Sequence, residues 1–293
     1  MTGGSGFIGR ELSRTLKDAG HNVSVTSRRR SSSEEVMALN PPELIPSDVI
    51  SKIDAVINLA GEPIAPKRWT KERKRSILSS RVDTTRALVE SIVKVEKRPR
   101  VFISASAIGY YGSHGDEYVT EDDLPDSDYL ADVCVKWEAE ARKAEKLGMR
   151  VVTVRLGGVL DVDGGALAQM VIPFKFFVGG PIGSGRQWFS WIHRDDVVGI
   201  IKYALEKGSV SGPLNATAPN PVTNKEFSNC LGKALHRPAC LPVPGFVVKL
   251  TLGELGDVLL TGQRVLPKSA LAEGYKFKYP EVNQALSAIF QKQ

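Results

Sequence analysis

The sequence has no long hydrophobic run, few cysteines and few histidines, and each shortage argues against a class of protein. No apolar stretch approaches the roughly 20 residues that a membrane span requires. Cys134, Cys230 and Cys240 are odd in number and lack metal-ligand spacing. We therefore expect reduced thiols and an intracellular, cytoplasmic location rather than a disulfide framework. The four histidines are scattered along the chain and predict no metal site.

The composition is ordinary for a globular protein, with 42% hydrophobic and 25% charged residues among 293. This length suits one large α/β domain, or a domain with a smaller lobe. The net charge of +6 includes basic clusters at residues 28–30, 67–68 and 71–75. No stacking aromatics or recognition motif accompany these clusters, so we expect no nucleic-acid partner. Solvated helix faces and an anionic cofactor explain the charge more simply.

The most informative stretch is the start of the chain, where three glycines stand at three-residue intervals within residues 3–9. Residues 8–19 then place apolar side chains on one helical face, and Gly20 provides a stop. A glycine loop that opens a helix lets backbone N–H groups and the positive end of the helix dipole approach a pyrophosphate. The predicted cofactor contacts in this stretch are Gly3, Gly6, Phe7, Ile8 and Gly9.

One element of a dinucleotide-binding fold is missing from the sequence. Residues 21–27 have the pattern of a strand, so loop, helix and strand follow in the expected order. The strand that should precede the loop is absent, because the sequence starts at Met1. We expect a shortened start and a gap in the middle of the sheet.

Later strands supply the rest of the predicted cofactor site. Strands are predicted at residues 54–61, 101–106 and 150–156, with a helix over 71–95. Ligands of an open parallel sheet bind beyond the carboxyl ends of its strands. Glu62 and Arg81 are predicted to contact the cofactor or each other. The predicted contacts at this edge are Leu59, Ala60, Gly61, Glu62, Arg81 and Arg155.

The end of the second strand indicates which dinucleotide is bound. NAD enzymes place an acidic residue there for the ribose 2′-hydroxyl, about 20 residues past the glycines. Here the positions are Ser27 and Arg28, with Arg29 next, and these suit a 2′-phosphate. The sequence therefore predicts NADP as the cofactor, with a solvated surface arginine as the alternative for Arg28.

The chain changes character after residue 156, where glycines become frequent. We predict an α/β fold, with a Rossmann-type doubly wound parallel sheet and a small C-terminal substrate lobe. We predict that the Rossmann domain covers residues 1–160 and that the chain returns to it at 187–215. The lobe is predicted to cover residues 161–186 and 216–293. Residues 187–193 are predicted as one strand, and the last helix lies near residues 280–290. His193 and Asp196 are interpreted as a structural junction and a helix cap.

These stretches resemble one protein family over essentially the whole chain. Residues 2–9, 58–61 and 183–196 are similar to motifs of the extended short-chain dehydrogenases/reductases, which include NAD-dependent sugar-nucleotide epimerases and dehydratases. The pieces 58–64, 136–138, 164–167, 179–188 and 190–193 look like the orphan "epimerase family protein" branch of atypical members. That resemblance implies NADP(H) binding and a substrate that is unknown.

The chain departs from this family at its catalytic pair, a Tyr with a Lys four residues later. None of Tyr110, Tyr111, Tyr118 and Tyr129 has a lysine at that spacing. Matching Glu138 to the family's trailing glutamate places Leu130 and Cys134 in the two positions. The resemblance makes Ser106 the substrate-orienting serine, while Tyr110 and Tyr111 are candidate substitute acids.

Two functions remain open at this point. The first is an NADP(H)-dependent oxidoreductase or epimerase-like enzyme acting on a small polar, sugar- or nucleotide-like substrate. The second is a non-catalytic NADP(H)-binding sensor or scaffold. We expect a small-molecule substrate as the partner and neither nucleic acid nor membrane, and a homodimer stays open.

Overall fold

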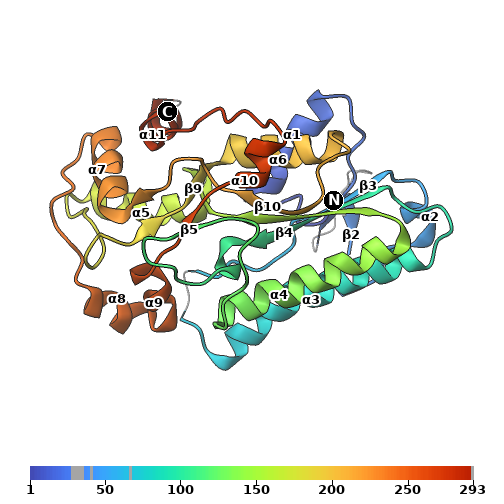
Figure 1. Cartoon of the computed structure of the whole chain (residues 1–293), viewed down its shortest axis with the longest axis horizontal. Helices are drawn as coiled ribbons and strands as arrows, with labels where there is room; N and C mark the ends of the chain where they lie inside the picture. The colour runs from blue at the N-terminus through green and yellow to red at the C-terminus, as the bar shows by residue number, and fades with distance from the viewer. Residues whose placement is uncertain (28–35, 40–41, 66–67, 292–293) are drawn as a thin grey trace.

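The computed structural model describes residues 1–27, 36–39, 42–65 and 68–291 (Figure 1). Its centre is a parallel sheet of four strands in the order β10 (Gly212–Ala216), β6 (Arg150–Leu156), β4 (Val101–Ala107) and β3 (Ala55–Asn58). The strands β4 and β6 are almost entirely buried, as is typical of a parallel sheet covered on both faces. The predicted Rossmann-type α/β fold is confirmed.

Helices cover both faces of this sheet (Figure 1). On one face lie α1 (Phe7–Asp18) and α6 (Arg194–Glu206), and on the other lie α2 (Ser47–Ile50), α3 (Lys71–Val93) and α4 (Tyr129–Arg142). Successive strand residues divide between the two hydrophobic cores. Ile103 packs on the α1–α6 side, and Phe102 packs on the α3–α4 side. This alternation is the period of two that a strand imposes on its side chains.

A gap separates this sheet from a second parallel pair, β1 (Val25–Ser27) with β2 (Val36–Ala38). Met1 and Thr2 lie in the gap. The Thr2 amide donates to the Ile57 carbonyl at 2.9 Å, and the Thr26 amide donates to the Met1 carbonyl at 2.9 Å. The two residues thus occupy the position between β3 and β1 where the sequence predicts a missing strand.

A lobe with its own hydrophobic core covers the carboxyl ends of the sheet. The helices α5 (Gly165–Lys175), α7 (Asn224–Leu235) and α11 (Val282–Gln291) supply residues to this core. The other C-terminal helices are α8 (Gly245–Leu252), α9 (Glu254–Leu260) and α10 (Lys268–Ala272), and Ala270 of α10 packs in the core of the sheet instead. Short strand pairs lie outside the central sheet: β7 (Gly158–Asp161) with β9 (Trp191–His193), β8 (Trp188–Phe189) with β11 (Val222–Thr223), and β5 (Tyr118–Val119) with β12 (Arg264–Val265). None of the helices in the described ranges is long and apolar enough to cross a bilayer. The predicted division into domains stays a prediction.

The strand predicted over residues 187–193 is two short strands, β8 and β9, that pair with different partners. The break falls at Ser190, where the chain passes from one partner strand to the other. The Ser190 hydroxyl donates to the Gln263 carbonyl at 2.8 Å and accepts from the Val265 amide at 2.9 Å.

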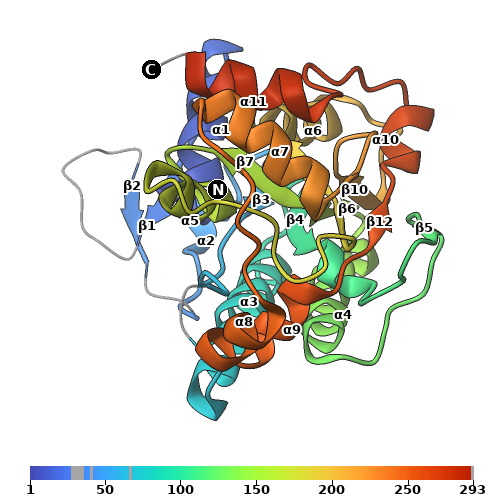
Figure 2. The same cartoon turned by 90° about the vertical axis from the view of Figure 1, so that its left-hand side faces the viewer.

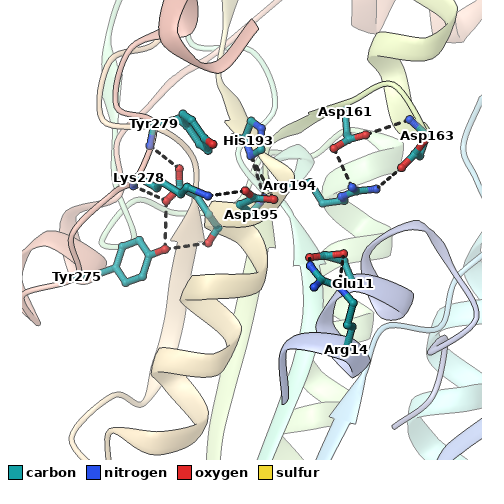
Figure 3. A network of polar contacts seen from close by, with 11 residues as sticks. Glu11, Arg14, Asp161, Asp163, His193, Arg194, Asp195, Tyr275, Lys278 and Tyr279 are labelled. Carbon is teal, nitrogen blue, oxygen red and sulfur yellow. Dashed lines mark hydrogen bonds and ion pairs between the residues drawn. The ribbon is translucent and has the colours of Figure 1, made fainter. Parts of the chain in front are cut away.

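The start of α6 fastens the C-terminal tail to the sheet (Figure 3). Asp196 accepts hydrogen bonds from the amides of Lys278 at 2.7 Å and Tyr279 at 2.9 Å, and from the Tyr275 hydroxyl at 3.2 Å. His193 caps α6, because its Nδ1 accepts from the Asp195 amide at 2.9 Å. The cap is therefore His193 rather than Asp196, which anchors the tail.

Candidate cofactor site

The glycine loop runs against the end of β3 so closely that a side chain would not fit at two of its positions. Gly3 has a φ of +68°, and a Cβ there would lie 2.6 Å from the Leu59 carbonyl carbon. A Cβ on Gly9 would collide with the carbonyl oxygen of Gly3. The Gly6 amide donates to that same carbonyl at 2.9 Å and closes the turn before α1. The sequence spacing therefore reflects a backbone packed directly on backbone.

The loop delivers the positive end of α1 to the carboxyl edge of the sheet. Gly6 is the N-cap residue, and its lack of a side chain leaves the first amides of the helix without a side-chain partner. No acidic residue stands in the first turn, so nothing there competes for those amides. Phe7 and Ile8 supply first-turn amides, while the Phe7 ring packs near Gly164 and Ile8 packs on the core. This arrangement favours a bound anion.

A cavity of about 380 Å³ opens at this helix end. It brings together most of the residues that the sequence assigns to the cofactor, from three separate segments. Those that line it are Gly3, Gly6, Ser27, Leu59, Ala60, Gly61 and Glu62. Arg28 lies outside the described residues, directly after Ser27. Of the two residues predicted for the 2′-phosphate, Ser27 therefore lines the cavity.

Sequence reasoning missed one wall of this cavity, which is a polar face of α3. The residues concerned are Ser76, Ser79, Ser80, Asp83 and Thr84. They recur at intervals of three and four, so they share one helical face, and this spacing was a signal that could have been used. The remaining lining residues are Thr2, Ser5, Thr26, Leu39 and Pro42.

Behind the cavity, Asn58 and Arg81 hold the loop that follows β3. Asn58 is fully buried; its Oδ1 accepts from the Thr2 hydroxyl at 2.6 Å and its Nδ2 donates to the Thr85 hydroxyl at 2.8 Å. Arg81 Nη2 donates to the Glu62 carbonyl at 3.0 Å, and the Glu62 carboxylate pairs with Arg73. Burial lowers the pKa of the Arg81 guanidinium. Arg81 thus contacts the backbone of Glu62 and does not line the cavity.

Arg155 and Ser106 belong to a buried polar network at the ends of β6 and β4. Arg155 is 3% exposed and forms a bidentate ion pair with Glu138, with Nε–Oε1 at 2.8 Å and Nη2–Oε2 at 2.9 Å. The Ser106 hydroxyl donates to the same Glu138 carboxylate at 2.7 Å. Burial alone would lower the pKa of Arg155, but the hydrogen bond and charge of Glu138 outweigh it and raise that pKa. The predicted roles of Arg155 at the cofactor and Ser106 in catalysis stay predictions, and these contacts give both residues a structural role.

The two candidate tyrosines lie in different surroundings. Tyr111 is fully buried; its hydroxyl accepts from Arg155 at 2.8 Å and donates to Asn215 Oδ1 at 2.8 Å. Burial raises the pKa of Tyr111 to about 12, so its phenol keeps its proton at neutral pH. Tyr110 is half-buried, and the Arg155 guanidinium carbon lies 3.5 Å from its ring centroid. Of the two, Tyr110 is the one that a ligand can reach.

The positions that correspond to the family's Tyr–Lys pair hold no acid–base group. Leu130 packs beside Gly109, where a Cβ would meet the Leu130 Cβ at 3.2 Å. Cys134 is buried with its Sγ 3.6 Å from the Ala107 carbonyl oxygen, and burial raises the pKa of its thiol to about 12. Neither side chain can transfer a proton at neutral pH.

The fold and the glycine-lined cavity define a dinucleotide-binding protein of the Rossmann class. The family described as NAD dependent epimerase/dehydratase matches residues 1–216, and a domain of unknown function, DUF1731, matches residues 243–289. The chain belongs to the NAD dependent epimerase/dehydratase family.

Three relatives illustrate this membership. The chloroplastic homolog of epimerase family protein SDR39U1 from Arabidopsis thaliana is 45% identical over 99% of this chain and 86% of its own. Human epimerase family protein SDR39U1, in a crystal structure with NADPH, is 37% identical with a TM-score of 0.90, covering 100% of this chain and 98% of that one. A nucleoside-diphosphate sugar epimerase from Corynebacterium glutamicum is 30% identical with a TM-score of 0.82, covering 100% of this chain and 57% of that one.

Proposed function

We propose that this chain is an NADP(H)-dependent oxidoreductase or epimerase-like enzyme that acts on a small polar substrate of the sugar-nucleotide kind. The observation that carries the proposal is the cavity at the start of α1, lined by Gly3, Gly6 and residues 59–62. Its backbone walls fit a pyrophosphate, because Gly3 and Gly6 line it without side chains and the first amides of α1 face it without a side-chain cap. The NADPH-bound human relative and the sugar-nucleotide epimerase relative support the cofactor and the substrate class.

Each part of the cavity has a separate task in holding this cofactor. The amides of the glycine loop and the first turn of α1 would bind the pyrophosphate. Ser27, with Arg28 after it, would bind the adenosine 2′-phosphate, and the polar face of α3 would border the remaining volume. When bound, the cofactor supplies hydride transfer at its nicotinamide.

Proton transfer to the substrate would fall to Tyr110 rather than to the Tyr–Lys positions. Its ring lies against Arg155, whose charge Glu138 holds in place. This cation–π contact fixes the orientation of the Tyr110 ring.

Removing the arginine that is predicted to bind the 2′-phosphate should lower the affinity for NADPH and not the affinity for NADH. A charge-assisted bond to phosphate contributes about 1.5–3 kcal/mol, so Arg28→Ala is expected to weaken NADPH binding about ten- to a hundredfold. NADH affinity should stay unchanged, and Arg142→Ala, an exposed arginine near the end of α4, serves as the charge-matched control. Calorimetric titrations that give equal losses for NADPH and NADH would refute the assignment.

Removing the Tyr110 hydroxyl should affect turnover and not cofactor binding. Tyr110→Phe is expected to reduce NADPH oxidation at least about tenfold across a panel of carbonyl and nucleotide-sugar substrates, since general acids typically contribute more than that. NADPH affinity should not change. Tyr118→Phe, at an exposed position, is the control. Full activity in Tyr110→Phe would place the acid elsewhere.

A second function, a non-catalytic NADP(H)-binding sensor or scaffold, is favoured by Leu130 and by the buried, protonated thiol of Cys134. It predicts NADPH binding with no turnover on any member of the same panel. The two functions therefore differ in a single assay.

A further inference from the structure

Large apolar side chains are exposed at one end of the lobe. Phe176 is 73% exposed, Phe246 is 71% exposed and Leu250 is 73% exposed. Isolated exposed apolar residues are normal on a protein surface, but a group of them marks an interaction site. We use the name apolar end face for the exposed apolar residues of two segments, one that follows α5 and one that leads into and includes α8: Phe176, Phe177, Val178, Leu241, Phe246 and Leu250.

Two segments far apart in the sequence build this face. Residues 178–183 follow α5 and run beside residues 241–245, which lead into α8. The Leu241 amide donates to the Gly179 carbonyl at 3.3 Å, and the Gly183 amide donates to the Val243 carbonyl at 2.8 Å. Both α5 and α8 lie at the left-hand end of the molecule in Figure 1, and Figure 2 looks onto that end. The face is therefore a product of the folded lobe.

The two sequence segments that contribute to the apolar end face carry basic and no acidic residues. Residues 164–194 and 227–253 contain no Asp or Glu, and their cations include Lys175, Lys233, Arg237 and Lys249. The guanidinium of Arg237 lies 4.5 Å from the ring centroid of Phe177, so cation and apolar surface are contiguous.

The neighbouring acids, which lie in α9, are already in ion pairs. Glu254 pairs with Lys74, and Asp257 pairs with Lys249 at 2.7 Å. Because Asp257 also neutralises Lys249, the positive charge of the face comes from Lys175, Lys233 and Arg237.

We propose that the apolar end face docks this protein on an anionic lipid surface. Exposed aromatic and aliphatic side chains enter the headgroup region, while flanking Lys and Arg side chains meet anionic headgroups. A second copy of the chain fits less well. A two-fold contact would place the same cations opposite one another. The sequence predicts no membrane partner because it has no hydrophobic stretch long enough to span a bilayer. Peripheral docking does not require such a stretch.

The test is sedimentation of the full chain with vesicles at low ionic strength. We expect binding to phosphatidylcholine vesicles that contain phosphatidylglycerol, little binding to phosphatidylcholine alone, and release by added salt. The double variant Phe176→Ser/Phe177→Ser should weaken binding at least about tenfold. Lys175→Glu/Arg237→Glu should weaken it by a similar factor or more, because each cation near the surface contributes about fivefold.

Matched controls keep the outcome specific to this face. Leu124→Ser removes an apolar side chain that is 81% exposed elsewhere, and Lys97→Glu reverses an exposed charge elsewhere. Both should bind vesicles as the unaltered chain does, and all variants should keep its melting temperature. Equal binding to both vesicle types, no binding to either, or equal losses in the controls would overturn the proposal. A concentration-dependent dimer that only Phe176→Ser/Phe177→Ser abolishes would identify a second copy as the occupant and overturn it as well.

Discussion

Glu138→Ala is expected to lower the free energy of unfolding by about 3–5 kcal/mol, because it leaves Arg155 buried without its counter-charge. The Arg155 guanidinium makes two of its hydrogen bonds to Glu138 and is 3% exposed, so water cannot replace the lost carboxylate. The Ser106 hydroxyl loses its acceptor in the same step. Chemical denaturation followed by circular dichroism measures the loss.

The same helix offers a control for this effect. Lys136 pairs with Asp132 at 2.7 Å on the exposed side of α4, and Lys136→Ala should change stability by about 0.5 kcal/mol or less. Glu138→Met combined with Arg155→Met should recover much of the loss, because it removes both buried charges at once. If Glu138→Ala has the same free energy of unfolding as Lys136→Ala, the Arg155–Glu138 ion pair does not hold β6 and α4 together.

Gly9→Ala is expected to weaken NADPH binding at least about a hundredfold, which corresponds to about 2.7 kcal/mol. The added Cβ would collide with the Gly3 carbonyl oxygen, and its next contact is the Gly4 Cα at 2.6 Å. Both obstacles are backbone, so the loop must move away from the position in which its amides converge. Calorimetric titration with NADPH measures the change.

Gly208→Ala is the matched glycine control. A Cβ at Gly208 meets nothing within 4 Å, and its φ lies outside the left-handed region. Its NADPH affinity should equal that of the unaltered chain. If Gly9→Ala also binds NADPH normally, the glycine loop is not the cofactor site.

The cofactor edge could be predicted because its signals are local. Glycine spacing, a helical apolar face and a strand that ends in small residues are each read within a dozen neighbouring residues. Gly3 and Gly9 are needed because the loop packs on backbone, and only glycine satisfies that condition. The seven predicted residues that line the cavity all come from such segments.

The polar network could not be predicted, because it depends on contacts between elements that no local pattern joins. The position of Arg155 at a strand end predicts a place at the cofactor rim, but its partner Glu138 comes from the middle of α4. Tyr110 and Tyr111 are adjacent in sequence, yet burial separates a reachable phenol from an enclosed one. The apolar end face arises in the same way, from residues whose exposure is fixed only by packing of the lobe.

Calorimetric titration of the unaltered chain with NADPH tests the central claim most directly. The claim is that the glycine-lined cavity at the start of α1 binds this dinucleotide. We predict saturable binding at one site per chain that is tighter than NADH binding and is lost in Gly9→Ala. An absence of heat and of any NADPH-dependent rise in melting temperature would contradict it.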